Sequence, residues 1–326
     1  MRKVQRRRFC LYTVVIVLAQ LLAFEASAQS YPNKPVRIVA GSAPGGGNDT
    51  ISRLLAPKLS EYLGQPVIVE NRPGASGVIA TERVALSPPD GYTLQMIVSS
   101  TLIVVALRAD LPFDLERDLA PVSLASSLSL VLMVHPSVPA RNVKELIALA
   151  RSRPGKLDFG STGVGSAAHL AGELFNSMAK IKLVNVPYKG SAGAVVATVA
   201  GEIPISFPSL SAALPLLGTG KIRLLAVTSA KRSSLTPSIP TLDESGVPGY
   251  DHTVWYGVLA PAAVPKDILA QLNAAILKLN TAEMKEAVIK GGQELQTSSS
   301  AQFAAFIRSE IAKNAKLIKL IGLKPE

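Results

Sequence analysis

Short runs of β-branched and aliphatic residues alternate along this chain with longer segments in which apolar residues recur at helical spacing. In the first part of the chain, this pattern predicts strands at 36–40, 67–70 and 92–98 and helices at 48–63 and 77–86. Asn48 or Asp49 is expected to cap the first helix. Strands that alternate with helices through short loops indicate a parallel, doubly wound sheet.

The rhythm is interrupted at 111–121, where charges and prolines gather, and 128–136 is predicted to form one long buried strand. A second series follows, with predicted strands at 157–160, 182–186, 203–207 and 222–228 and predicted helices at 142–152, 166–179, 191–200 and 209–217. A strand at 255–261 and helices at 265–279, 281–290 and 300–321 close the chain. The fold class is therefore α/β with two doubly wound domains.

Two crossings, near 122–134 and 245–258, would let the closing helices return to the first series. This predicts a first domain of 29–125 with 252–326 and a second domain of 126–251. Two sheets joined by two crossing strands leave a cleft between them, and open α/β sheets bind ligands at the carboxyl ends of their strands.

Residues 1–28 have the order of a secretory signal peptide: a basic head, an apolar run from 9 to 24, and the small-x-small pattern Ala26-Ser27-Ala28. An uncleaved anchor is the alternative, and Arg6-Arg7-Arg8 leaves open whether export uses the general or the twin-arginine route. We expect a periplasmic protein that begins near Gln29.

Removal of 1–28 takes five basic residues and one acidic residue from the chain and leaves 29 Lys and Arg against 22 Asp and Glu. The basic residues are scattered, whereas nucleic-acid sites usually show a concentrated stripe, so no nucleic-acid partner is expected. Cys10 is the only cysteine and leaves with the leader, which excludes thiol chemistry in the mature protein. His135, His169 and His252 lack metal-ligand spacing. We expect no metal and no cofactor.

A glycine-rich loop joins the first predicted strand to the helix that follows it. Glycines let a ligand approach backbone amides, and the start of a helix offers unpaired N–H groups and a positive dipole. A nucleotide phosphate loop would need Gly-Lys-Ser/Thr, which is absent here. An unliganded connection is the alternative. The candidate binding residues are Ser42, Ala43, Pro44, Gly45, Gly46, Gly47, Asn48 and Asp49.

A second glycine and hydroxyl loop lies at the equivalent place in the second series. Its "GVGSAA" (163–168) matches a dinucleotide pattern, but the acidic residue expected on the next strand is missing. Two such loops, one in each half, favour the binding of one small anion between them. The candidate residues here are Ser161, Thr162, Gly163, Gly165, Ser166 and His169, although His169 can equally pack or cap.

The chain resembles the extracytoplasmic receptors of tripartite tricarboxylate transporters, the Bug-type receptors, over nearly all of the predicted mature chain. The resemblance rests on "YPNKPVRIVAGSAPGGGND", "VENRPGASG", "FGSTGVGSAAHLAGELF", "VPYKGSAGA" and "IPTLDESGVPGYDHTVWYGVLAPAAVPKDILAQLN". It implies a periplasmic-binding-protein fold, type II-like, and a small carboxylate held in the cleft largely by backbone amides of the two loops. Tyr188, in "VPYKGSAGA", joins the expected site. The resemblance also implies membrane permease subunits as partners and a monomeric receptor.

The chain departs from the family pattern at several places. After the third strand it carries the apolar stretch "TLIVVAL" (101–107), and it has Gly193, Ala197, Pro204 and Phe207-Pro208 where the family usually has proline or acidic residues. These changes favour a less polar ligand. Two other functions stay open: an exported α/β enzyme acting on a carboxylic ester, against which the lack of a G-x-S-x-G elbow speaks, and a sensor for a signalling system.

The leader generates the first testable prediction. Periplasmic material purified from an expressing bacterium should start at Gln29 when its N-terminus is sequenced, because a peptidase cuts after the small residue Ala28. An Ala28→Arg variant is the control, and it should keep the leader. A parent protein that retains residues 1–28 in the membrane fraction would contradict the prediction.

Overall fold

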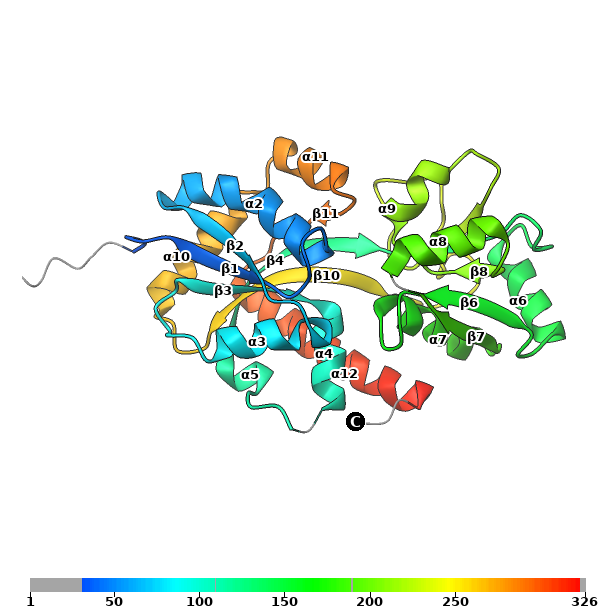
Figure 1. Cartoon of the computed structure of the whole chain (residues 1–326), viewed down its shortest axis with the longest axis horizontal. Helices are drawn as coiled ribbons and strands as arrows, with labels where there is room; N and C mark the ends of the chain where they lie inside the picture. Colours follow the sequence, from blue (N-terminus) through cyan, green and yellow to red (C-terminus); the bar gives the residue numbers. More distant parts are fainter. Residues whose placement is uncertain (1–30, 109, 189, 323–326) are drawn as a thin grey trace, which may run out of the picture.

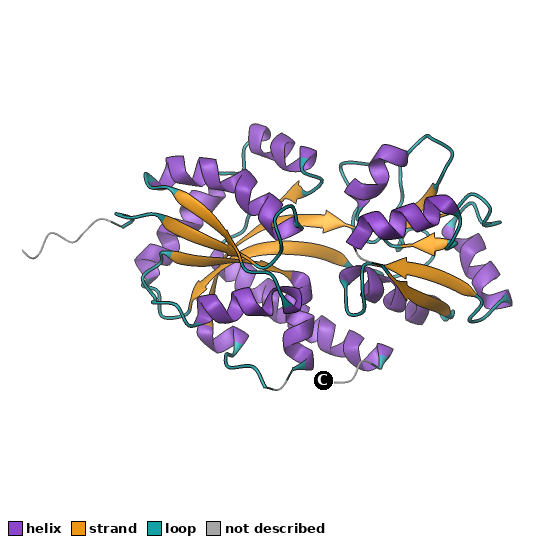
Figure 2. Cartoon of the chain, in the orientation of Figure 1, coloured by secondary structure: helices purple, strands orange, loops and turns teal. Residues whose placement is uncertain are grey.

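The computed structural model describes residues 31–322 except 109 and 189, so the predicted signal peptide lies outside the described residues. The chain forms two halves, each built on its own sheet with helices packed on it (Figures 1 and 2). The order of strands is β11-β4-β10-β3-β1-β2 in the first sheet and β7-β6-β8-β5-β9 in the second. This is the α/β architecture that the hydrophobic pattern predicts.

The first half opens with the predicted alternation of strands and helices. Its elements are β1 (Val36–Ala40), α2 (Gly47–Leu63), β2 (Val67–Asn71), the 3₁₀ turn η1 (Ala75–Gly77), α3 (Val78–Ala85) and β3 (Thr93–Val98). β1 lies between β2 and β3 and is parallel to both. Apolar residues of α2, among them Ile51, Leu55 and Leu59, are buried in the same cluster as Ile38 of β1.

Two long strands connect the halves. β4 (Leu119–Ser129) and β10 (Thr253–Pro261) are antiparallel neighbours, and β10 also pairs antiparallel with β3. The chain passes from β4 through Leu130 directly into β5 (Val131–Val134) of the second sheet. The single long strand expected at 128–136 is therefore wrong: it is two strands in two sheets, because Leu130 bridges Ser209 at the point where the pairing changes.

The second half carries the second series. Its elements are α6 (Val143–Ser152), β6 (Leu157–Ser161), α7 (Ala167–Ala179), β7 (Leu183–Pro187), α8 (Gly190–Ala200), β8 (Ile205–Ser206), α9 (Leu210–Ala213), η2 (Leu214–Leu216) and β9 (Arg223–Val227). β6 is parallel to β7 and β8, whereas β5 is antiparallel to β8 and β9. The core of this half includes Phe159, Phe175 and Phe207, whose rings contact one another.

The closing helices return to the first half and then reach the second. They are α10 (Lys266–Leu277), α11 (Ala282–Lys290) and α12 (Ser300–Ile321), with β11 (Glu294–Leu295) before the last of them. A capping box of Ser299 and Gln302 starts α12. Near its other end, Leu317 packs with Leu170 of α7, so this helix touches both halves. Among the described residues, none of the helices combines the length and apolar character that a membrane span requires.

The stretch after β3, for which no element was predicted, contains two helices. Residues Ser99–Leu107 form helix α4, and Leu115–Asp118 form the short helix α5. The apolar residues of α4 explain why it folds as a helix, since Leu102 and Ile103 are buried against neighbouring elements. The segment is therefore part of the packed body of the first half.

Candidate functional site

The first glycine-rich loop leaves the carboxyl end of β1 and leads directly into α2. The helix starts at Gly47, and Gly46 is its N-cap residue without any side-chain cap. Expecting Asn48 or Asp49 as the cap is therefore wrong. Both side chains have partners elsewhere: the Asn48 amide donates to the carbonyl of Met96 at 2.9 Å, and the Asp49 carboxylate turns back toward the loop.

Asp49 organises the loop from inside. Its carboxylate is only 4 % exposed and accepts hydrogen bonds from the Gly45 N–H at 2.9 Å, the Asn71 amide at 2.8 Å and the Arg53 guanidinium at 2.8 Å. Burial alone would raise the pKa of Asp49, but the hydrogen bonds from Gly45 and Asn71 and the Arg53 charge together hold it below its ordinary value. The carboxylate is charged and already satisfied, so it shapes the loop.

In the part of the chain that the structure describes, the start of α2 has both paired and unpaired backbone groups. The Asp49 N–H lies 3.4 Å from the Ser42 hydroxyl, and the carbonyl of Gly47 accepts from the Gln293 amide at 3.1 Å. The N–H groups of Gly47 and Asn48 have no acceptor among the described residues. Unpaired amides at a helix start form a ready site for an anion.

Two glycines make this loop possible. Gly45 has a φ of +82°, which disfavours any other residue. A side chain at Gly46 would place its Cβ 2.6 Å from the Ser42 side chain. The structure therefore requires glycine at both positions to build the loop itself, independently of any ligand.

The second loop joins β6 to α7 and is held by its own side chains. Ser166 is the N-cap of α7 and accepts from the His169 N–H at 3.2 Å, while the Gly165 N–H donates to His169 Nδ1 at 3.0 Å. The Ser161 hydroxyl is buried and lies 3.3 Å from the Gly163 carbonyl and 3.4 Å from its N–H. Thr162 is the predicted hydroxyl residue that keeps no side-chain partner among the described residues.

His169 acts within this loop. Because its Nδ1 accepts a hydrogen bond, the neutral ring carries its proton on Nε2, 3.9 Å from Glu173. Burial lowers the pKa of His169, and the nearby Glu173 charge only partly offsets this effect. The sequence left open whether His169 binds a ligand or packs and caps within the protein. These contacts support packing and capping.

Tyr188 lies beside the second loop. Its N–H donates to the carbonyl of Ser161 at 3.0 Å, and its ring lies 3.4 Å from the position that a Cβ on Gly160 would take. Burial raises the pKa of its hydroxyl, which stays protonated. Tyr188 therefore follows β7 at the same sheet edge from which the second loop leaves β6.

The two loops occupy corresponding places in the two halves. Each follows the carboxyl end of a parallel strand, and Figure 1 shows both ends directed toward the other half. Neither loop, at 42–49 or 161–166, contains a lysine or an arginine. Ligand contact by these residues stays a prediction.

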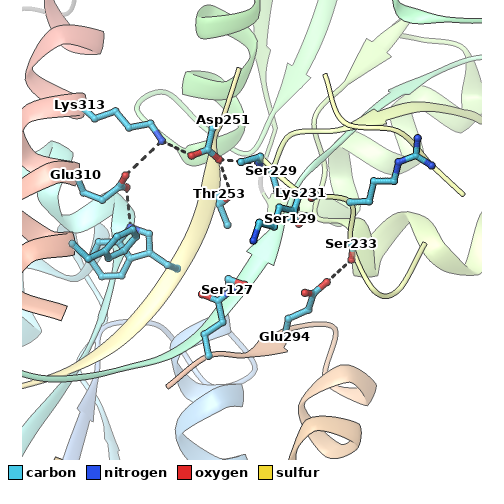
Figure 3. A pocket seen from close by; sticks show the side chains of 15 residues that line it. Ser127, Ser129, Ser229, Lys231, Ser233, Asp251, Thr253, Glu294, Glu310 and Lys313 are labelled. Atoms are coloured by element: carbon cyan, nitrogen blue, oxygen red, sulfur yellow. Dashed lines mark hydrogen bonds and ion pairs between the residues drawn. The ribbon is translucent and has the colours of Figure 1, made fainter. Parts of the chain in front are cut away.

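A groove of about 510 Å³ lies elsewhere along the crossing strands (Figure 3). Neither glycine loop contributes to it. Its walls come from both halves and are formed by Ser127, Ser129, Ser229, Ala230, Lys231, Arg232, Ser233, Asp251, Thr253, Trp255, Glu294, Gln296, Phe306, Glu310 and Lys313. In the first sheet, β11 pairs with β4 on the side away from β1 and β3. In the second sheet, β9 pairs with β5, which continues β4, on the side away from β6 and β7. The sequence analysis did not identify this groove, because its residues are scattered over 127–313.

The carboxylates of the groove are held by protein partners. Glu294 accepts from the Ser233 hydroxyl at 2.5 Å and the Ser234 N–H at 3.1 Å, which links β11 of the first half to the second half. Lys313 of α12 bonds to Asp251 at 3.1 Å, and Asp251 accepts from the Ala230 N–H at 3.1 Å. These contacts connect the two halves on the groove side.

The sequence matches a known family over most of its length. Residues 51–323 match the profile described as the Tripartite tricarboxylate transporter family receptor. Protein BugT of Bordetella pertussis is 35% identical over 306 residues, which cover 93% of this chain and 94% of that protein.

Solved structures give the same fold. Rpa4515 of R. palustris, solved with adipate, has a TM-score of 0.79 and 35% identity, with 91% of this chain and 100% of that chain covered. MatC from Rhodopseudomonas palustris, solved with bound malate, has a TM-score of 0.73 and 29% identity, covering 88% and 100%. The periplasmic binding protein BugD is also similar, at a TM-score of 0.75 and 28% identity, with 91% and 100% covered. The periplasmic-binding-protein fold expected from the sequence is confirmed.

Replacement of Asp49 should destabilise the first loop in a pH-dependent way. Asp49→Ala removes the acceptor that Gly45, Asn71 and Arg53 share and should cost about 1–3 kcal/mol of unfolding free energy at pH 7. Because the folded-state pKa lies below the ordinary value, this contribution is complete above about pH 4 and is lost as the pH falls through the lowered value. Denaturant titrations of parent and variant between pH 7 and pH 3 measure it.

The matched control is Asp110→Ala, which removes a carboxylate that is 72% exposed and should leave the denaturation curve unchanged. A stability difference between parent and Asp49→Ala that persists undiminished at the lowest pH would contradict the role given to the charged carboxylate.

Loss of the Glu294 contact should let the halves rotate. A rotation about the crossing strands that closes the loop side opens the groove side, so Glu294→Ala should favour closure between the loops. Cysteine-attached spin labels at the exposed Ile68 on β2 and Val184 on β7 would report a shorter mean distance. Glu286→Ala, which removes an exposed carboxylate of α11, is the control. An unchanged or longer distance in the Glu294 variant alone would refute the idea.

Proposed function

The chain belongs to the tripartite tricarboxylate transporter receptor family, and from that premise we propose that it captures a small carboxylate between its two halves and delivers it to a tripartite membrane transporter. Proteins of this family are periplasmic solute-binding receptors. The observation that carries this proposal is the pair of N–H groups at the start of α2 that have no acceptor among the described residues, together with a second glycine loop at the corresponding strand end of the other half.

Carboxylate chemistry fits these donors. A carboxylate taken out of water needs hydrogen-bond donors around it, and backbone amides at a helix start supply them in fixed positions. Both loops are held in shape by buried side chains, namely Asp49 in the first and His169 in the second. A preformed site loses less conformational entropy when it binds its ligand. The solved relatives with adipate and malate support the same ligand class.

The body of the ligand is proposed to be less polar than a tricarboxylate. The segment after β3 is the apolar helix α4, and Ala197 and Pro204 stand where the family usually has acidic residues. None of these positions supplies a charged side chain that could meet additional ligand charges. A dicarboxylate with an aliphatic or aromatic body suits this composition.

The remaining parts of the proposal follow from the family. The chain is exported through residues 1–28, acts in the periplasm as a monomer without catalysis, and docks on membrane permease subunits. Domain boundaries of 29–125 with 252–326 and of 126–251 go with this proposal. An esterase would need a nucleophile and a base in contact. A sensor would instead dock on a signalling kinase, which a co-purification experiment with the permease subunits distinguishes from transport.

Substitutions in the two loops should weaken carboxylate binding. Gly46→Val forces Ser42 away and displaces the amides of α2, while Ser161→Ala releases the contacts of the second loop with Gly163. Each lost hydrogen bond to a charged ligand should reduce affinity by about 10- to 150-fold. Calorimetry with adipate, malate and a wider carboxylate panel measures this effect.

Ser309→Ala, an exposed serine on α12, is the matched control and should bind as the parent does. Circular dichroism establishes that each variant is folded. The two-loop site is wrong if both folded loop variants keep the parent affinity, and the carboxylate function is wrong if the parent binds no member of the panel at millimolar concentration.

A further inference from the structure

Tyr256 places a hydroxyl group at the start of α2, a position that could not be predicted from the sequence. Along β10, side chains alternate between the two faces of the sheet. Trp255 belongs to the cluster with Phe303 of α12, whereas Tyr256 belongs to the cluster that contains Ile51 of α2. The Tyr256 side chain therefore lies on the face of the sheet that carries α2, opposite the face that carries α12.

The contact with α2 is very close. A Cβ built on Gly47 would lie 2.0 Å from the Tyr256 hydroxyl oxygen and 2.7 Å from the ring carbon that carries it. Because the Cβ of a helical residue points toward the helix N-terminus, the hydroxyl lies on the N-terminal side of Gly47. The unpaired N–H groups of Gly47 and Asn48 belong to this same end of the helix. The close approach of Tyr256 therefore requires a glycine at position 47.

The Tyr256 hydroxyl has no hydrogen-bond partner among the described residues. Tyr256 as a whole is only 5 % exposed, but its oxygen is not one of the fully enclosed unpaired atoms, so it keeps access to the surface. Tyr250, which is 1 % exposed, instead donates to the Ala171 carbonyl at 2.8 Å. Buried tyrosine hydroxyls usually find a partner. An unpaired donor beside a helix start with two unpaired amides is the chemistry of a site whose acceptor comes from outside the chain.

The strand itself is distorted at this residue. Tyr256 pairs with Val98 of β3 and Ser126 of β4, and the register with β4 shifts between Tyr256 and Gly257. Such irregularities redirect a side chain and occur next to functional sites. Ser126, which pairs with Tyr256, also donates its hydroxyl to the Gln293 side chain, and the Gln293 amide donates to the Gly47 carbonyl. Tyr256 and Gly47 are therefore connected through Ser126 and Gln293.

From these contacts we infer that Tyr256 is a ligand-binding residue, which donates its O–H to the carboxylate held by the Gly47 and Asn48 amides. This inference rests on the proposed function and adds a specificity-determining residue to it. A carboxylate offers about four acceptor positions on two oxygens, and the two amides and the Tyr256 hydroxyl can occupy three of them. An ester or a primary amide of the same ligand keeps only neutral acceptors and should bind more weakly.

The hydroxyl also keeps its proton under all working conditions. Burial raises the pKa of Tyr256 to about 12, so the group stays a neutral donor at periplasmic pH. Like the two amides, the hydroxyl donates a hydrogen bond to the charged ligand and carries no charge itself. Affinity should therefore stay constant between pH 6 and pH 9 as far as Tyr256 is concerned.

The test compares Tyr256→Phe with Tyr250→Phe. Because the Tyr256 hydroxyl has no partner in the free chain, its removal should leave the melting temperature of the unliganded protein unchanged or slightly higher. The affinity of the Tyr256→Phe variant for the tightest-binding carboxylate of the panel, which is tested starting with adipate, should fall by about 10- to 150-fold. Tyr250→Phe should show the reverse: a lower melting temperature through loss of the bond to Ala171, with parent affinity.

The outcomes separate this inference from the function on which it rests. If the parent and Tyr256→Phe bind the carboxylate equally while Gly46→Val loses binding, the carboxylate site stands and Tyr256 is only a core residue. If Tyr256→Phe lowers the melting temperature without changing affinity, the hydroxyl is structural and the inference is overturned. If the parent binds none of the carboxylates, the proposed function fails and this inference fails with it.

Discussion

The antiparallel pairing of β4 with β10 is the interaction on which the other features depend. These two strands carry the chain between the halves, and β10 also pairs with β3, which in turn pairs with β1. The position of the first glycine loop relative to the second half is therefore set through a continuous ladder of backbone hydrogen bonds. Such a ladder resists stretching but bends and twists, so it keeps the two loops at corresponding ends while it allows the halves to rotate.

The loops gain their shape from buried polar groups, each of which has a named partner. Asp49 is satisfied by Gly45, Asn71 and Arg53, and His169 accepts from Gly165. Burying a charge costs free energy unless it is paired, so these side chains hold the loops only because several partners meet them at once. What remains unpaired at the start of α2 is a small set of donors, and the proposed carboxylate site depends on them.

The sequence predicted the elements whose signal is local. β1, α2, β6 and α7 begin and end within two residues of the expected positions, because hydrophobic spacing and glycines mark them. The sequence-based prediction failed where contacts between distant residues determine the local structure. Asn48 and Asp49 do not cap α2, because their side chains bond to Met96 and Asn71 instead. The chain changes sheets at Leu130, which bridges the distant Ser209. Tyr256 lies in the strand predicted at 255–261, and only the tertiary structure sets its hydroxyl against Gly47.

Neighbouring residues of β10 connect the loop side to the groove side. Trp255 donates its indole N–H to Glu310 at 2.9 Å in the groove, whereas the next residue, Tyr256, contacts the start of α2. Alternation along a strand makes such opposite placement unavoidable, and the irregular pairing after Tyr256 gives the strand a point where it can twist. Any rotation of β10 that moves the Tyr256 hydroxyl against Gly47 must also move the indole against Glu310 and Lys313. The groove contacts and the loop contacts are therefore connected through two adjacent residues of one strand.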